Sequence, residues 1–157
     1  MRSTSYLALY GPEARKNEMA RMFGYVPMII GQGELLDTKL SFADRRFHGE
    51  APTIETAPGE NTPCIVYWLE YYEQRRLERR LGYPLGIARG TYYASIEGTE
   101  PIKVLAYYVP GTRQRISPGE ELIGQMTDLY EQNGWDTEHL GHVVTHSGEG
   151  PSIRRIR

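Results

Sequence analysis

The sequence contains a single cysteine, Cys64, among its 157 residues. An internal disulfide is therefore impossible, and this usage fits a reducing compartment, so we expect a cytoplasmic protein. Cys64 lies in the apolar run "CIVYWL", which predicts an inert core residue rather than a nucleophile. No stretch approaches the roughly 20 apolar residues of a membrane span, and the first apolar run is too short for a signal peptide. We therefore expect no membrane partner.

Several catalytic and cofactor motifs are also missing. The sequence has no G-x-S-x-G elbow, no P-loop and no G-x-G-x-x-G fingerprint, so we expect no cofactor. The net charge of −2 gives no global field that favours nucleic acid, and we expect no nucleic-acid partner. The basic runs "RRLERR" and "PSIRRIR" are typical of a solvated helix face and a flexible tail at about 147–157. Length and composition otherwise fit one domain over 1–157, as a monomer or homodimer.

Three histidines are spaced to share one face of the last predicted helix. They are His139, His142 and His146, and a pair at i, i+4 can grip a transition metal. No acidic or cysteine partner accompanies them. A solvated helix face is the favoured interpretation, and we predict no metal site.

The patterns that are present predict an α+β fold, a small mixed β-barrel flanked by helices. β-branched and aromatic runs indicate strands, and apolar residues three or four apart, bounded by glycines, indicate helices. A capping box at Ser117 and Glu120 is predicted to start one of these helices. The polar stretch 43–63 is predicted to be loop with one brief strand at 51–55. The other elements are expected as strands at 5–11, within 28–42, at 64–69, 90–96 and 103–109, and helices at 16–24, from 70, at 117–134 and at 137–146.

Several segments form an ordered set of motifs: "YLALYGPEARKNEMARM", "GQGELLDTKLSF", "APTIETAPGENTPCIVYWL", "LERRLGYP", "LAYYV" and "SPGEELIGQMTDLYEQNG". Their order and spacing resemble the γ-glutamylcyclotransferase superfamily over nearly the whole chain. The resemblance implies a barrel fold and an enzyme in which a substrate's free α-amine attacks its own γ-carbonyl, closing 5-oxoproline and releasing an amine. In the family, a glutamate of an E-G-Y-P motif moves the proton, and a Y-G-x-N turn supplies donors to the substrate.

This sequence departs from the family pattern at the polar positions of that site. Leu81 stands where the resemblance places the glutamate, and Glu13 stands at the asparagine of the turn. Ile87 and Leu122 occupy positions where the family usually has tyrosine. The retained family residues are Tyr6, Tyr10, Gly11, Gly82, Tyr83, Pro84 and Arg89. By helix periodicity alone, Leu81 is an ordinary core residue; beside the family pattern, it marks a lost proton carrier.

Three hypotheses follow from these departures. The first is a protein without ordinary cyclotransferase activity that binds a small molecule or a partner in a remodelled pocket. The second is an active enzyme with a relocated acid, for which Glu13, Glu78 and Glu70 are the candidates. The third is an interaction protein with a collapsed pocket. The residues predicted to line the ligand site are Tyr6, Tyr10, Gly11, Pro12, Glu13, Leu81, Gly82, Tyr83, Ile87 and Leu122.

Overall fold

The computed structural model describes residues 4–45, 49–97, 99–110 and 115–147. The predicted tail lies outside these residues, apart from Ser147. The strands are β1 (Thr4–Leu9), β2 (Met28–Asp44), β3 (Glu50–Glu70), β4 (Ala88–Ile96) and β5 (Ile102–Tyr108). The helices are η1 (Pro12–Ala14, a 3-10 turn), α1 (Lys16–Phe23), α2 (Tyr71–Leu81), α3 (Glu120–Asn133) and α4 (Thr137–His146). In the described residues, no helix is both long and apolar enough to cross a membrane.

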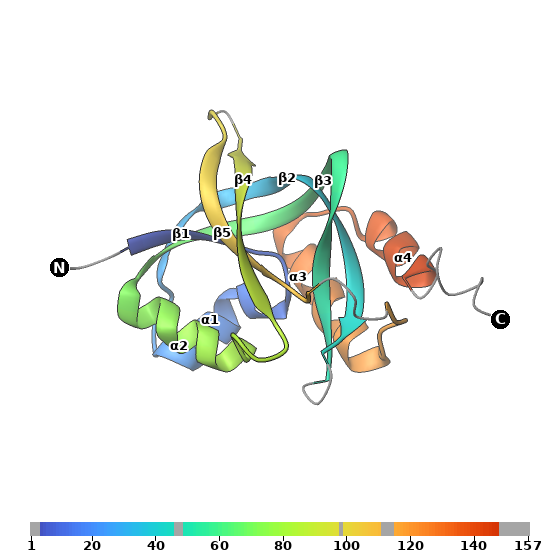
Figure 1. Ribbon diagram of the computed structural model, residues 1–157, viewed down its shortest axis with the longest axis horizontal. Coiled ribbons are helices and arrows are strands. Elements are labelled where there is room, and N and C mark those ends of the chain that lie inside the picture. Colours follow the sequence, from blue (N-terminus) through green and yellow to red (C-terminus); the bar gives the residue numbers. More distant parts are fainter. Residues whose placement is uncertain (1–3, 46–48, 98, 111–114, 148–157) are drawn as a thin grey trace.

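The strands close into a barrel in the order β1-β3-β2-β4-β5, which confirms the predicted mixed barrel flanked by helices. The pairs are antiparallel except for β1 with β5, which are parallel and meet at Leu7 and Leu105. Helices α1 and α2 lie together at one end of the molecule and α4 lies at the other, while the β4–β5 hairpin projects away from both (Figure 1). The barrel therefore holds the turn after β1 close to the helices α1 and α2.

The brief strand predicted at 51–55 is present, but the prediction of loops is wrong for 43–44, 50 and 56–63; residues 46–48 lie outside the described residues. β2 and β3 form one long hairpin in which Leu40 pairs with Ile54 and Leu36 pairs with Asn61, with register shifts at two points along β2. Much of the middle of this stretch faces solvent, which accounts for its polar composition. Backbone pairing with β2 holds it in an extended conformation despite its prolines and glycines. The two short strands expected within 28–42 are likewise one continuous strand, β2.

The barrel interior and the helices that cover it share one hydrophobic core. Fully buried side chains come from β1, β2, β3, α1, α2 and α3, and burial of each large aliphatic side chain contributes about 1.5–3 kcal/mol to folding. The hydroxyl of buried Tyr67 donates a hydrogen bond of 2.7 Å to the carbonyl of Ala14, which ties η1 to the barrel wall. The largest of these buried side chains include Leu7, Leu9, Met19, Leu35, Phe42, Val66, Tyr67, Leu69, Leu77 and Met126.

The helix boundaries follow local capping chemistry. Gly24, Gly82 and Gly134 end α1, α2 and α3 in the left-handed conformation, as their sequence positions predict. The capping box predicted at Ser117 is wrong, because α3 begins at Glu120 with Gly119 as its N-cap and no side-chain cap. The carboxylate of Glu50 instead accepts from the Gly119 backbone N–H at 2.9 and 3.1 Å.

Candidate functional site

The turn after β1, the last turn of α2 and the start of α3 surround a cavity of about 250 Å³. Charged, aromatic and aliphatic side chains all line it. Six of the residues predicted for the ligand site line it: Tyr10, Pro12, Glu13, Leu81, Ile87 and Leu122. The cavity shows that this region is not collapsed, so the third hypothesis loses its structural basis.

Glu13 reaches this cavity from η1, the short turn that follows β1. Gly11 precedes that turn in an extended conformation, and Pro12 starts it. A Cβ atom at Gly11 would lie 2.9 Å from Glu13 Oε1 and 2.9 Å from Pro52 Cγ, so only glycine leaves room for the carboxylate to fold back over the turn. The glutamate therefore occupies the space directly above its own turn.

Burial raises the pKa of the Glu13 carboxyl above its ordinary value. A hydrogen bond from its own backbone N–H opposes this rise, as do the positive charges of Arg45, Arg15 and Arg80. Within the described residues Glu13 forms no salt bridge. A carboxyl with a raised pKa that lines a cavity is a group able to attract an ammonium or to exchange a proton with a bound ligand.

Leu81 is the last residue of α2, and Gly82 ends the helix directly after it with φ of 89°. The Leu81 side chain is partly buried and lines the cavity. Its carbonyl oxygen accepts a hydrogen bond of 3.0 Å from Arg45 Nη1. Desolvation lowers the pKa of Arg45, and the negative charge of Glu13 partly offsets this effect. The cavity thus contains the guanidinium of Arg45, the carboxyl of Glu13 and, at the end of α2, the hydrocarbon side chain of Leu81.

The apolar wall of the cavity comes from Ile87 and Leu122, which are 5% and 7% exposed. Tyr10 completes it, and its hydroxyl donates to the carbonyl oxygen of Tyr107 at 2.5 Å. Burial raises the pKa of Tyr10 well above its ordinary value, so this hydroxyl stays protonated. These side chains form a surface suited to a hydrocarbon portion of a ligand.

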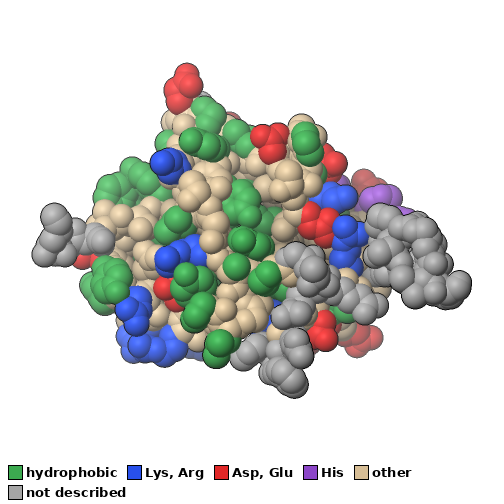
Figure 2. Space-filling model, in the orientation of Figure 1, with side chains coloured by type: hydrophobic (Ala, Val, Ile, Leu, Met, Phe, Trp, Pro, Cys, Tyr) green, Lys and Arg blue, Asp and Glu red, His purple; other side chains and the backbone are tan. Residues whose placement is uncertain are grey.

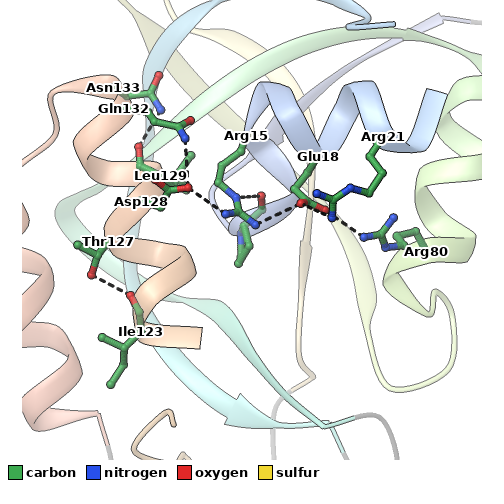
Figure 3. Close-up of polar contacts among 11 residues, drawn as sticks. Arg15, Glu18, Arg21, Arg80, Ile123, Thr127, Asp128, Leu129, Gln132 and Asn133 are labelled. Atoms are coloured by element: carbon green, nitrogen blue, oxygen red, sulfur yellow. Dashed lines mark hydrogen bonds and ion pairs between the residues drawn. The ribbon is translucent and has the colours of Figure 1, made fainter. Parts of the chain in front are cut away.

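The other carboxylates at the cavity are already engaged. Glu18 lies among three guanidinium groups, at 3.0 Å from Arg21, 3.2 Å from Arg80 and 3.6 Å from Arg15. Arg15 extends this network to Asp128 of α3 at 3.0 Å (Figure 3). Because Glu18 is saturated by these contacts and Glu50 binds the N-terminus of α3, Glu13 is the available acid of the cavity.

Glu78 and Glu70, the other candidate acids, lie elsewhere. Glu78 is 5% exposed and its Oε2 accepts from Tyr107 at 2.7 Å, Gln74 at 3.0 Å and Arg89 at 2.5 Å. This carboxylate does not line the cavity that holds Leu81. Glu70 caps α2, in a capping box with Glu73.

The remaining predicted residues are dispersed around the cavity. Tyr6 packs edge-on against Trp68 at 4.6 Å between ring centroids. Tyr83 packs edge-on against Tyr107 at 5.9 Å and lines a different pocket, next to α2. Arg45 and Tyr107 line the cavity but were not singled out from the sequence. Arg45 lies in the stretch interpreted as loop and Tyr107 in an ordinary strand pattern, so no sequence signal distinguished them.

The three histidines of α4 are exposed, as predicted for a solvated face. The rings of His142 and His146 lie 4.4 Å apart between centroids. Across the residues that the structure describes, no group of three or more His, Cys, Asp or Glu side chains is arranged to hold a metal ion. Cys64 is fully buried in β3, which confirms the core position predicted for it.

Comparison of the sequence with protein-family models and with curated proteins gives no match. The structure does match solved structures. A gamma-glutamyl cyclotransferase aligns with a TM-score of 0.77 and 15% identity, over 90% of this chain and 86% of that one. An uncharacterized protein from Homo sapiens aligns with a TM-score of 0.77 and 15% identity, over 89% of this chain and 86% of that one. YkqA from Bacillus subtilis aligns with a TM-score of 0.73 and 20% identity, over 94% of this chain and 56% of that one. The chain therefore has a γ-glutamylcyclotransferase-like fold.

Proposed function

We propose that this chain binds a small ligand with an amine and an apolar part in the cavity at the end of α2, without ordinary cyclotransferase activity. The observation that carries the proposal is Leu81, which lines the cavity at the position where the sequence resemblance places the proton-transferring glutamate. A hydrocarbon side chain neither accepts nor releases a proton, so it cannot act as a general base.

The charges and surfaces of the cavity support this ligand class. Glu13 has no salt-bridge partner in the described part of the chain, and an ammonium group would supply one in a partly desolvated setting where the attraction is strong. Arg45 offers a guanidinium to a carboxylate on the same ligand. Leu81, Ile87 and Leu122 offer an apolar wall to its hydrocarbon part.

The direct test is 5-oxoproline release from γ-glutamyl amines and γ-glutamyl dipeptides by the purified chain. We expect no release above the level of a protein-free control. Binding is tested in parallel by calorimetry with γ-glutamyl butylamide, which carries the α-amine, a carboxylate and an apolar tail. Glu13→Gln should weaken that binding, whereas Glu97→Gln, which removes an exposed carboxylate from the β4–β5 turn, should leave it unchanged.

A second candidate function is catalysis with Glu13 as the relocated acid or base. It is favoured by one observation, the raised pKa of a carboxyl that lines the cavity. Turnover by the wild-type chain that disappears in Glu13→Gln would establish this function and overturn the first. Turnover that survives Glu13→Gln but disappears in Glu78→Gln would overturn both.

A further inference from the structure

A second pocket lies between α2, the turn at Tyr83 and Pro84, and Arg89 of β4. Its volume is about 350 Å³, and none of its lining residues lines the first cavity. Lys and Arg side chains gather in this part of the molecule, at the lower left of Figure 2, where Figure 1 places α1 and α2. The pocket is lined by Tyr71, Gln74, Arg75, Glu78, Arg79, Tyr83, Pro84 and Arg89.

The only acid of this pocket, among the described lining residues, is already neutralised. Glu78 is 5% exposed and accepts hydrogen bonds from Arg89, Tyr107 and Gln74 through the same oxygen, Oε2. Arg89 therefore balances Glu78, and this pair contributes no net charge to the pocket. Any further positive charge on the walls is available to a ligand.

Arg75 and Arg79 supply that charge. Both are exposed, and neither forms a salt bridge with any described residue. They lie four residues apart on α2, a spacing that places two like charges side by side on one helix face, where they repel each other. The chain as a whole carries a net charge of −2, so Arg75 and Arg79 form a local positive patch on a protein that is negative overall. An anion placed between the two guanidinium groups would relieve their repulsion.

Aromatic rings hold two arginines of the pocket in place. Arg75 donates to the Tyr71 hydroxyl at 2.7 Å, and its guanidinium carbon lies 5.6 Å from the Tyr71 ring centroid. The guanidinium carbon of Arg89 lies 4.7 Å from the Tyr83 ring centroid. A guanidinium oriented in this way presents N–H donors in a fixed fork that matches the oxygens of a phosphate, and less of its freedom is lost on binding.

We infer that this pocket binds the dianionic phosphate group of a small organic phosphate between Arg75 and Arg79. Two uncompensated positive charges match a dianion, whereas a carboxylate would neutralise one of them. The rings of Tyr71 and Tyr83 offer faces on which a planar organic part of the ligand packs. The inference is independent of the function proposed for the first cavity, because the two share no lining residue.

The test uses phenyl phosphate as the probe, titrated calorimetrically into the full chain at pH 8 and constant ionic strength. We expect saturable binding that Arg75→Ala and Arg79→Ala each weaken by about tenfold, the typical effect of losing a hydrogen bond to a charged group. Arg76→Ala is the matched control, because Arg76 is an exposed arginine of the same helix that does not line the pocket. It should change the affinity by less than about twofold, as screened surface charges do.

Three further measurements identify the group that is bound and its location. Phenyl sulfate has the same ring but a single charge, so it should bind about tenfold more weakly than phenyl phosphate. Binding of phenyl phosphate should fall as the pH drops through about 6, where a phosphate monoester gains its second proton.

Arg45→Ala alters the first cavity and should leave the affinity for phenyl phosphate unchanged. Absence of saturable binding, an equal loss in Arg76→Ala, equal binding of phenyl sulfate, or a loss in Arg45→Ala would each overturn the inference.

Discussion

The hydroxyl of Tyr107 donates a hydrogen bond of 2.7 Å to Oε2 of Glu78, the oxygen that also receives Arg89 and Gln74. The buried carboxylate therefore joins α2 to β4 and β5. Burial of the Tyr107 phenol and its hydrogen bond to Glu78 raise the pKa of that phenol, so it remains a donor. Glu78, three residues before Leu81, therefore has a structural role, because its carboxylate holds α2 against β4 and β5.

Glu78→Ala should destabilise the protein. The change leaves the hydroxyl of Tyr107, the amide of Gln74 and the charge of Arg89 without their shared acceptor. We expect a loss of about 2–3 kcal/mol in the free energy of unfolding, below the usual cost for a fully buried pair because Arg89 is partly exposed. Urea denaturation measures this loss, and Glu97→Ala, an exposed control, should cost less than about 0.5 kcal/mol. An equal effect of the two substitutions would contradict the prediction.

Glu13 should make stability depend on pH in a defined direction. Burial raises its folded-state pKa above the unfolded value of about 4.3, so within that interval the folded state binds more protons than the unfolded state. Stability contributed at this position is therefore highest at low pH and declines as the pH rises above about 4. Urea denaturation from pH 4 to pH 8 should show the wild type losing stability relative to Glu13→Gln. A relative gain across that range would show that the sign is wrong.

Leu81→Glu alone should not create a cyclotransferase. The substitution returns an acid to the helix end, but Glu13, Ile87 and Leu122 still differ from the family pattern, and proton transfer needs a substrate held in a productive geometry. Leu81 is partly exposed beside Arg45, so the new carboxylate should cost no more than about 1 kcal/mol of stability. The measurement is 5-oxoproline release from γ-glutamyl amines, with thermal unfolding as the check on folding. Measurable release by this single variant would refute the prediction.

Cys64 should be unreactive in the folded protein. Its side chain is fully buried, and burial raises the pKa of the thiol to about 12, so almost none is thiolate at pH 8. Labelling with a thiol-specific chromogenic disulfide should be negligible in buffer and complete in urea. Cys64→Ser provides the blank for the assay. Rapid labelling without denaturant would show that β3 opens readily.

The sequence was sufficient to predict the elements with strong local signals. Helix α1 ends at Gly24 and α2 at Gly82 because glycine accepts the left-handed conformation that stops a helix. Asp136 caps α4 by accepting from the backbone N–H groups of Glu138 and His139. The pairing of β4 with β5 follows from alternation across a turn. Such features are decided within a few residues of the chain.

The features that depend on distant partners were not predictable. The extension of β3 through Pro58, Gly59 and Pro63 depends on its pairing with β2, which overrides the local preference for turns. The start of α3 is set by Glu50, 69 residues from Gly119 along the chain. At the site, the family pattern singled out Glu13 and Leu81, which line one cavity in the structure, but it carried no information on Arg45, which donates to the Leu81 carbonyl from the end of β2.

The parallel pairing of β1 with β5, called the seam here, is the short contact that closes the barrel. β1 pairs with β3 at six positions but with β5 only where Leu7 meets Leu105. Breathing of the native state should begin along this seam, and amide hydrogens beside it should exchange with deuterated solvent earlier than those between β2 and β3. Because β1 leads directly into the turn that carries Glu13, such opening should also displace the Glu13 carboxyl within the cavity.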